Sequence, residues 1–234
     1  MSTPIATPAD SATPTTRRVT VFELALVLGL PTAVFLAGAV KSLVRPRAVH
    51  FTSGGVVSTL VLEAILVALL LPLLRRRGWR PTQVAGTPQP LDVLRGVGVW
   101  LAAMAAFYFV WIVFALSAPT WAAAVQAQPL RGHVSAMVIV IGSVLNPVFE
   151  EFLWLGYGVS ALESRLGLRR ASVVSLGLRV SIHAYQGVRA IVGVLPGSAV
   201  LTWYYARTRR LWPIVVAHVI WDAVGLAFLA MPHR

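Results

Sequence analysis

The sequence predicts an all-α membrane protein, a polytopic bundle of about seven transmembrane helices. Charged residues make up only 12% of the 234 residues and hydrophobic residues 57%, whereas soluble domains have about 25% charged residues. Several apolar runs exceed the ~18 residues that a helix needs to cross a bilayer. Most basic residues lie between these runs, where they set topology through contact with anionic headgroups.

Seven apolar segments follow one another along the chain. They cover residues 19–40, 54–74, 94–117, 135–162, 171–187, 190–206 and 211–230. The first segment follows Arg18 and ends at Lys41 without an A-x-A-like cleavage site, so we interpret it as a retained span and not as a signal peptide. The alternative to seven spans is an eighth one within residues 118–134.

Three parts of the chain are expected. Residues 1–18 are rich in Thr, Pro and Ala without hydrophobic periodicity, which is typical of a disordered tail. Residues 19–134 hold the N-terminal helices and two loops, a Pro/Gly-rich basic loop at 75–93 and a second loop at 118–134. Residues 135–234 form a helical core with the candidate catalytic residues.

The arginine distribution predicts a cytoplasmic N-terminus, and we expect the membrane to be a bacterial-type plasma membrane. With this orientation thirteen arginines lie on the cytoplasmic side and six basic residues on the other. The thirteen are Arg17, Arg18, Arg75, Arg76, Arg77, Arg80, Arg95, Arg165, Arg169, Arg170, Arg207, Arg209 and Arg210. The six are Lys41, Arg45, Arg47, Arg131, Arg189 and Arg234. Arg179 is the one basic residue that falls within a predicted span.

Composition also excludes some functions. The net charge of +12 comes without a basic patch interleaved with aromatic residues, so we expect the bilayer, and no nucleic acid, as a partner. The chain has no cysteine, which excludes disulfides and thiolate metal sites.

Ionisable residues within spans are the main functional signal. An ionisable side chain at the bilayer centre costs about 2.5–3.5 kcal/mol on insertion scales, so it normally faces a protein interior or a cavity. Glu23 lies near the start of its helix, and Glu63 has no evident partner, so both are interpreted as structural. The remaining residues share a similar depth on three predicted helices; they are Glu150, Glu151, His183, His218 and Asp222.

Depth and spacing bring these five residues together. At ~1.5 Å per residue from the cytoplasmic helix ends, four of them lie about 17–20 Å deep and His218 about 11–12 Å deep. His218 and Asp222 are four residues apart and share a helix face. Glu150 and Glu151 differ by ~100° around the helix, so one can act on substrate while a neighbour holds the other. A buried glutamate suits a general base near neutral pH.

The motifs EEFLWLGY (150–157), SIHAYQG (181–187) and WYYARTRRLWPIVVAHVIWD (203–222) resemble those of the CPBP intramembrane proteases. This family includes type II CAAX prenyl endopeptidases and bacterial Abi proteins, and the resemblance covers about residues 140–230. It implies an intramembrane endopeptidase that hydrolyses membrane-associated or CAAX-like, in some cases lipidated, peptides or proteins.

The resemblance also implies residue roles. Glu150 activates the attacking water, His183 helps to hold that water, and Glu151 supports the site. His218 and Asp222 stabilise the oxyanion or complete a metal site. A divalent metal such as Zn²⁺, held by Glu150, His183 and His218, fits the ligand chemistry, although the sequence does not require it.

Two positions depart from the family pattern EExxxR and FxxxH. Leu155 stands where the family has arginine, and Arg179 stands where it has phenylalanine. A guanidinium within a span is costly unless it is paired with a carboxylate. We therefore predict that Arg179 replaces the missing arginine and contacts a carboxylate, with Glu151 as the first choice. The alternative is decay of the site in an inactive descendant.

Two other classes of function stay open. A proton-coupled transporter also carries intramembrane Glu, His and Asp, although no inverted repeat is evident. A noncatalytic membrane scaffold or immunity protein could be built on the same fold. Other intramembrane proteases are disfavoured, because the chain has no HExxH motif and no GxGD aspartate pair.

Overall fold

A computed structural model describes residues 19–44, 50–126, 131–186 and 190–230 of the chain. The described residues are almost entirely helical, and several of the helices are long and apolar enough to cross a membrane. The predicted fold class, an all-α membrane helix bundle, is confirmed. The predicted tail at residues 1–18 lies outside the described residues.

The N-terminal half contains three long rods and two short helices. The first rod is continuous and consists of α1 (Val21–Leu24), the π-helical segment η1 (Ala25–Gly29) and α2 (Leu30–Val44). The elements that follow are α3 (Ser53–Arg76), α4 (Pro81–Ala85), α5 (Leu91–Ser117) and α6 (Pro119–Gln126). The Thr52 hydroxyl accepts a hydrogen bond from Gly55 N at 3.0 Å and so caps α3.

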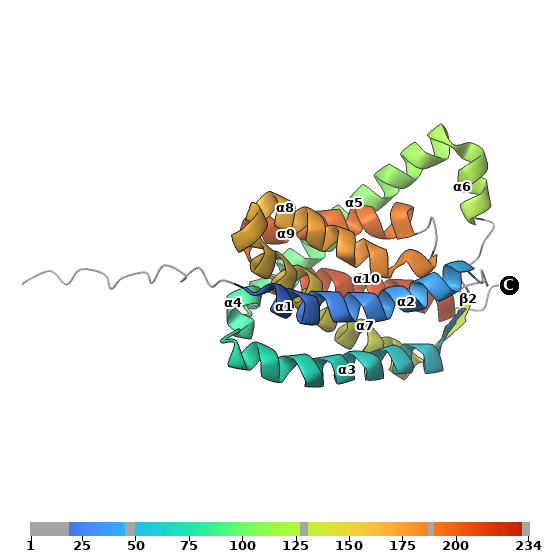
Figure 1. Cartoon of the computed structure of the whole chain (residues 1–234). Helices are drawn as coiled ribbons and strands as arrows, with labels where there is room; N and C mark the ends of the chain where they lie inside the picture. The colour runs from blue at the N-terminus through green and yellow to red at the C-terminus, as the bar shows by residue number, and fades with distance from the viewer. Residues whose placement is uncertain (1–18, 45–49, 127–130, 187–189, 231–234) are drawn as a thin grey trace, which may run out of the picture.

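The C-terminal half holds four further rods. Its elements are α7 (Ala136–Glu150), the π-helix η2 (Glu151–Tyr157), α8 (Gly158–Ile182), the 3₁₀ turn η3 (Ala184–Gln186), the π-helix η4 (Ala190–Val194), α9 (Leu195–Thr208) and α10 (Trp212–Ala230). Gly167 has φ 73° and ψ 158°, a conformation that breaks the helix. The chain reverses there, so α8 consists of two segments on either side of Gly167 (Figure 1).

The alternative of an eighth span within residues 118–134 is not supported by the described residues. α6 has eight residues, less than half the length that a crossing requires, and Arg131–His133 form the strand β2. β2 pairs in parallel with β1 (His50–Thr52), a short strand pair that helical periodicity could not predict. The expected loop between the fourth and fifth spans is also shorter than predicted, since helix continues up to Gly167.

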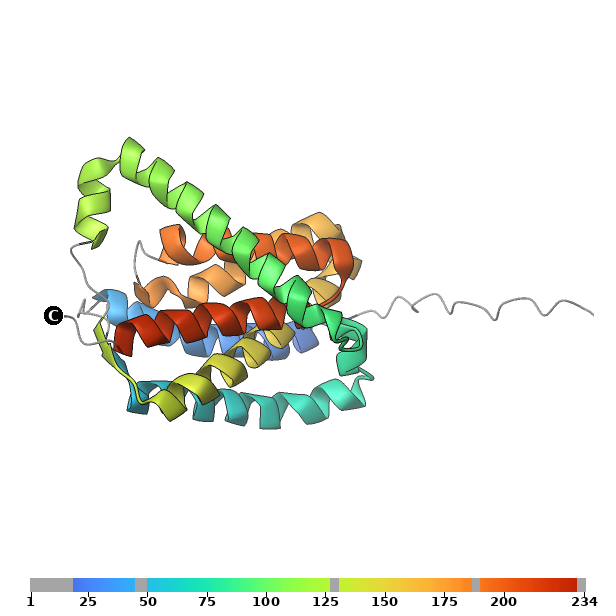
Figure 2. The same cartoon turned by 180° about the vertical axis from the view of Figure 1, so that it is seen from behind.

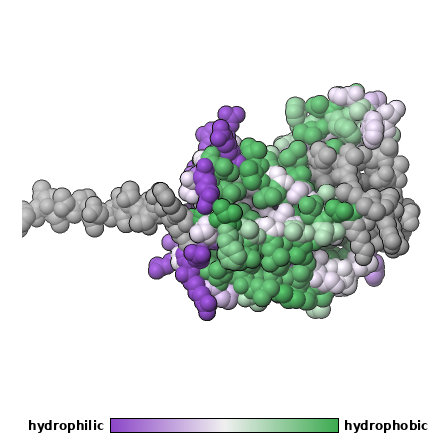
Figure 3. All heavy atoms as spheres, in the orientation of Figure 1, coloured by the Kyte–Doolittle hydropathy of each residue, from purple (hydrophilic) through white to green (hydrophobic). Residues whose placement is uncertain are grey.

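The long helices run between two ends of the bundle (Figures 1 and 2). One end carries the start of α1, the end of α3, α4, the start of α5 and the bend of α8 (Figure 1). The strands β1 and β2, together with α6, lie at the opposite end. The hydrophilic residues gather at the first end, whereas an apolar surface covers the middle of the bundle (Figure 3).

The apolar surface consists of large side chains that a soluble protein would bury. Exposed examples on three helices are Val61, Leu69, Leu101, Phe109 and Val140. Such a continuous apolar belt requires an apolar solvent. The chain is therefore an integral membrane protein.

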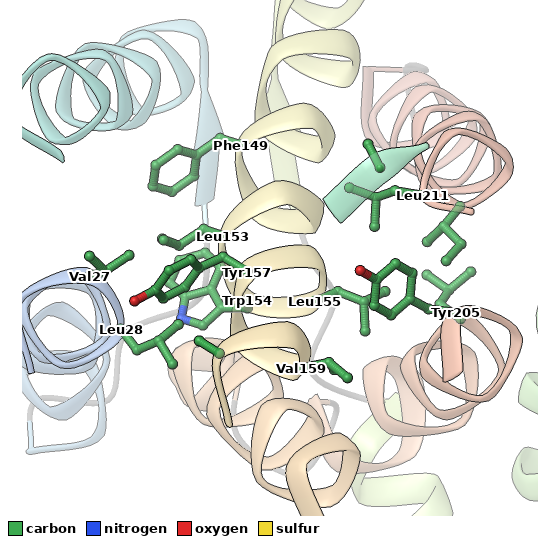
Figure 4. Close-up of a cluster of buried hydrophobic side chains, with 14 of the residues drawn as sticks. Val27, Leu28, Phe149, Leu153, Trp154, Leu155, Tyr157, Val159, Tyr205 and Leu211 are labelled. Carbon is green, nitrogen blue, oxygen red and sulfur yellow. The ribbon is translucent and has the colours of Figure 1, made fainter. Parts of the chain in front are cut away.

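The core lies around η2, near the hydrophilic end (Figure 4). Trp154 is fully buried, and its ring makes edge contacts with Phe35 and Phe149 at centroid distances of 5.6 Å. On the other side of η2, Leu155 points toward Tyr205 and Leu211 (Figure 4). The packing fixes η2 between the first rod and the α9–α10 corner.

An ion pair holds that corner against the loop before α5. The Arg210 guanidinium donates to both oxygens of the buried Asp92 carboxylate, each at 2.8 Å. These hydrogen bonds raise the pKa of Arg210 above its ordinary value. Trp212 Nε1 also donates to the Gly86 carbonyl at 3.0 Å, so the loop and the corner form one unit.

Candidate active site

Four elements, α7, η2, α8 and α10, carry the candidate residues to one place in the bundle. Glu150 ends α7 and Glu151 begins η2, so the two acids straddle a change of helix type. Pro147 lies one turn earlier and lacks the backbone N–H that a regular helix would use. π-Helical turns are frequent at functional sites, because they change the direction in which side chains point.

Glu150 faces α8 through one of its carboxylate oxygens. Asn146 Nδ2 donates to Glu150 Oε1 at 2.9 Å, one turn back along α7. His183 Nε2 lies 4.0 Å from the same oxygen, too far for a direct hydrogen bond. A water molecule fits a separation of this kind, since it can bond to both groups at once.

The orientation of His183 is fixed by its own helix. Its Nδ1 lies 2.9 Å from the Arg179 carbonyl oxygen, which can only accept a hydrogen bond. Nδ1 therefore carries a proton, and in the neutral imidazole Nε2 is left as an acceptor that faces Glu150. Histidine and glutamate thus present two acceptors to one point.

Glu151 is the buried centre of a second chain of charged groups. Arg179 Nη2 donates to Glu151 Oε1 in a short hydrogen bond, so the expected ion pair between these two residues is present. His218 Nδ1 lies 2.7 Å from the same oxygen and 3.2 Å from Arg179 Nη2. On the other side of the ring, His218 Nε2 lies 3.4 Å from Asp222 Oδ1.

Several polar atoms of the cluster have no hydrogen-bond partner among the described residues. They are Glu150 Oε2, Glu151 Oε2, Arg179 Nε and Arg179 Nη1, all of them buried. Buried polar atoms are nearly always paired, and exceptions concentrate where a ligand or solvent binds. The free atoms come from the residues that the motifs single out, which marks this cluster as a binding site.

Every predicted site residue is therefore in one cluster. Glu150 and Glu151 come from α7 and η2, Arg179 and His183 from the end of α8, and His218 and Asp222 from α10. Glu151 is completely inaccessible and Arg179 is 4% exposed, whereas the Asp222 side chain is 26% exposed. Asp222 therefore has the most exposed side chain of the six.

The arrangement does not fit the metal set Glu150, His183 and His218. Among the described residues, no three His, Cys, Asp or Glu side chains are placed to hold a metal ion. Both nitrogens of His218 face carboxylates other than Glu150, and the Arg179 guanidinium occupies the neighbouring position. We therefore derive no catalytic step through a metal.

Two site residues were missed by the sequence reasoning. Glu63 of α3 is buried and interacts electrostatically with Glu150, Asp222 and His218. It was interpreted as structural because its partners lie on helices distant in sequence. Asn146 could have been found from its position four residues before Glu150, on the same helix face.

Fold and site together define a polytopic membrane protein with a buried cluster of ionisable residues. Residues 132–224, which contain the six predicted site residues, match the family described as type II CAAX prenyl endopeptidase Rce1-like. The match confirms, over these residues, the family resemblance predicted from the three motifs. No curated protein and no solved structure matches the chain.

Proposed function

We propose that this protein is an intramembrane endopeptidase in which Glu150 and His183 activate a water molecule for attack on a peptide bond. The observation that carries the proposal is the pair of acceptors, Glu150 Oε1 and His183 Nε2, held 4.0 Å apart. Asn146 and the Arg179 carbonyl fix these two side chains, so the water site is preorganised.

The reaction follows from these positions. Water gives a proton to Glu150 as its oxygen attacks the carbonyl carbon, which forms a tetrahedral intermediate. Collapse of the intermediate breaks the C–N bond, and Glu150 returns the proton to the leaving amine. Glu151, His218 and Asp222 form the buried support that keeps the Arg179 side of the site in place.

The surroundings of the site favour a substrate that arrives through the membrane. The cluster is buried between helices whose outer faces carry exposed apolar side chains. The family description names prenyl endopeptidases that act on CAAX sequences. We propose membrane-associated or CAAX-like peptides as substrates, reached from a bacterial-type plasma membrane with the N-terminus in the cytoplasm.

A peptide-cleavage assay tests this function. The purified protein in liposomes is offered lipidated and unlipidated peptides with CAAX-like ends, and products are identified by mass spectrometry. Glu150→Ala and His183→Ala should each lower kcat by about 10²–10⁴-fold, because each removes a group that positions or deprotonates the water. Glu163→Gln, an exposed carboxylate at the bundle end, is the matched control and should cleave like the wild type.

One alternative has an observation in its favour. Leu155 replaces the family arginine and is buried in an apolar cluster, so a noncatalytic scaffold on the same fold is the second candidate. Wild-type protein that cleaves none of the peptides, or cleavage that persists in Glu150→Ala, would favour that candidate.

A further inference from the structure

Arg179 has more hydrogen-bonding capacity than its known contacts use. A guanidinium has five N–H donors, and in this site only Nη2 is engaged, with Glu151 and His218. Nε and Nη1 are buried without a partner among the described residues. Since unpaired donors on a buried cation are costly, these two nitrogens are suited to an acceptor that the protein itself does not supply.

Arg179, which carries the free donors, and the proposed water site are linked through α8 and through the adjacent acids Glu150 and Glu151. Arg179 and His183 are four residues apart on α8, so about 6 Å separates them along one helix face. They face two adjacent acids, because Arg179 bonds to Glu151 while His183 faces Glu150. The pairs Arg179–Glu151 and His183–Glu150 are therefore neighbours between the same helices. The proposed water site belongs to the second pair, and the free N–H groups belong to the first.

His218 is poorly placed to stabilise an oxyanion itself. Its Nδ1 is directed at Glu151 and its Nε2 at Asp222, so neither ring nitrogen is left for a substrate. Its contacts instead hold Glu151 in place, and Glu151 in turn holds Arg179. A donor for the developing negative charge must come from another residue.

We propose that Arg179 is that donor and acts as a catalytic residue through its free N–H groups. As water attacks, the electron pair of the C=O bond moves to oxygen, and this oxyanion accepts hydrogen bonds from Arg179. When the C–N bond breaks, the pair returns to form the new carboxyl group. A guanidinium suits this role because it stays protonated and its charge is fixed before the reaction starts.

This inference rests on the proposed function, and a simpler role must be separated from it. Arg179 could serve only to neutralise the buried Glu151. In that case removal of both charges would restore the site, because no unpaired carboxylate is left. If Arg179 contacts the substrate, removal of both charges restores the fold but not the reaction.

The experiment compares Glu151→Gln, Arg179→Met and the double variant Glu151→Gln/Arg179→Met. Melting temperature, kcat and KM are measured for each in liposomes, with the wild type and Glu150→Ala beside them. We expect Arg179→Met to lose stability and activity. The double variant should regain the melting temperature of Glu151→Gln yet have a kcat about 10²–10³-fold below it, with little change in KM. Equal kcat in the double variant and Glu151→Gln overturns the proposal.

Arg179→Lys tests the same proposal independently if the methionine variants do not fold or if Glu151→Gln is inactive. Lysine keeps the charge opposite Glu151 but lacks the second and third nitrogens of the guanidinium. An unchanged melting temperature with a kcat at least ~30-fold lower supports the proposal, and wild-type kcat overturns it. An active wild type with an inactive Glu150→Ala shows that the proposed function stands whichever result is obtained for Arg179.

Discussion

At the scale of single residues, the burial of Glu63 has no local explanation. It lies on α3, outside the region that matches the protease family, and yet it interacts with Glu150, Asp222 and His218. Carboxylates brought together in a buried place repel one another. The protein therefore holds an acid where it is unfavourable for stability, beside the cluster that we propose as the active site.

This leads to a prediction for Glu63→Gln. Glutamine has nearly the same shape but cannot ionise, so the variant removes the cost of burying an ionisable acid and should melt about 2–4 °C higher, as expected for roughly 1 kcal/mol. Thermal unfolding in detergent checks this. Glu163→Gln, which removes an exposed carboxylate that is paired with Arg209, should not raise the melting temperature. A lower melting temperature for Glu63→Gln would mean that the carboxylate makes a stabilising hydrogen bond.

The contact of a residue could be predicted from the sequence where its chemistry allows only one kind of partner. A guanidinium in a span needs a carboxylate, and Arg179 does pair with Glu151. The fate of Leu155 could not be predicted in this way, since an apolar residue fits many environments. In the structure its side chain fills space beside Tyr205 and Leu211, away from the charged groups (Figure 4).

At the scale of elements, the π-helix η2 decides where the two glutamates point. Its wider turns weaken the regular pattern of backbone hydrogen bonds, and hydroxyl groups from neighbouring helices bond to carbonyls within it. Ser175 donates to the Trp154 carbonyl in a short hydrogen bond, and the Tyr205 hydroxyl lies 3.3 Å from the Gly156 carbonyl. Gly156 also allows close packing, since a Cβ there would lie 3.2 Å from Leu211 Cδ2 and would make that side chain shift.

We predict that Ser175→Ala destabilises the protein by about 1–3 kcal/mol, because it leaves a buried carbonyl without its donor. Peptide hydrolysis should fall as well, since Glu151 begins the segment that the hydroxyl holds. Thr202→Val is the matched control. Its hydroxyl is equally buried but bonds to the Ser198 carbonyl in its own helix, so its effect should be smaller. Equal losses in both variants would show that η2 needs no such support.

At the scale of the whole molecule, the charges separate the two ends of the bundle. The end that carries the α3–α4 loop, the bend of α8 and the α9–α10 corner holds the exposed arginines (Figures 1 and 3). Arginines on one side of a membrane protein indicate its cytoplasmic side. The orientation proposed from the sequence therefore places this end in the cytoplasm.

Single-cysteine labelling tests this orientation, and the absence of native cysteine makes it direct. Arg80→Cys and Arg169→Cys should react with a membrane-impermeant reagent only after the cells are permeabilised. Trp121→Cys and His133→Cys, at the opposite end, should react in intact cells. Opposite labelling of positions 80 and 169 would contradict the bundle itself, and inversion of all four would contradict the orientation only.

The sequence by itself determined the fold class and the family resemblance, and it singled out six candidate site residues that lie in one cluster. In the bilayer core no water is available to bond to backbone N–H and C=O groups, and within an apolar run an α-helix pairs these groups with one another. Apolar runs of membrane-spanning length therefore imply a helical bundle. Ionisable residues in such runs are expensive, and this cost marks them as candidate functional residues without any structure.

Only the tertiary structure decided how these residues divide the work. The structure places Glu150 next to His183, and Glu151 next to Arg179 and His218. It also adds Glu63 and Asn146 to the cluster. It also replaced the suggested metal set by a buried ion pair. The physical reason is that residue spacing along a helix fixes only the face and the depth of a side chain, whereas hydrogen bonds depend on how helices distant in sequence pack. A π-helical turn also changes which face of the helix the following residues occupy.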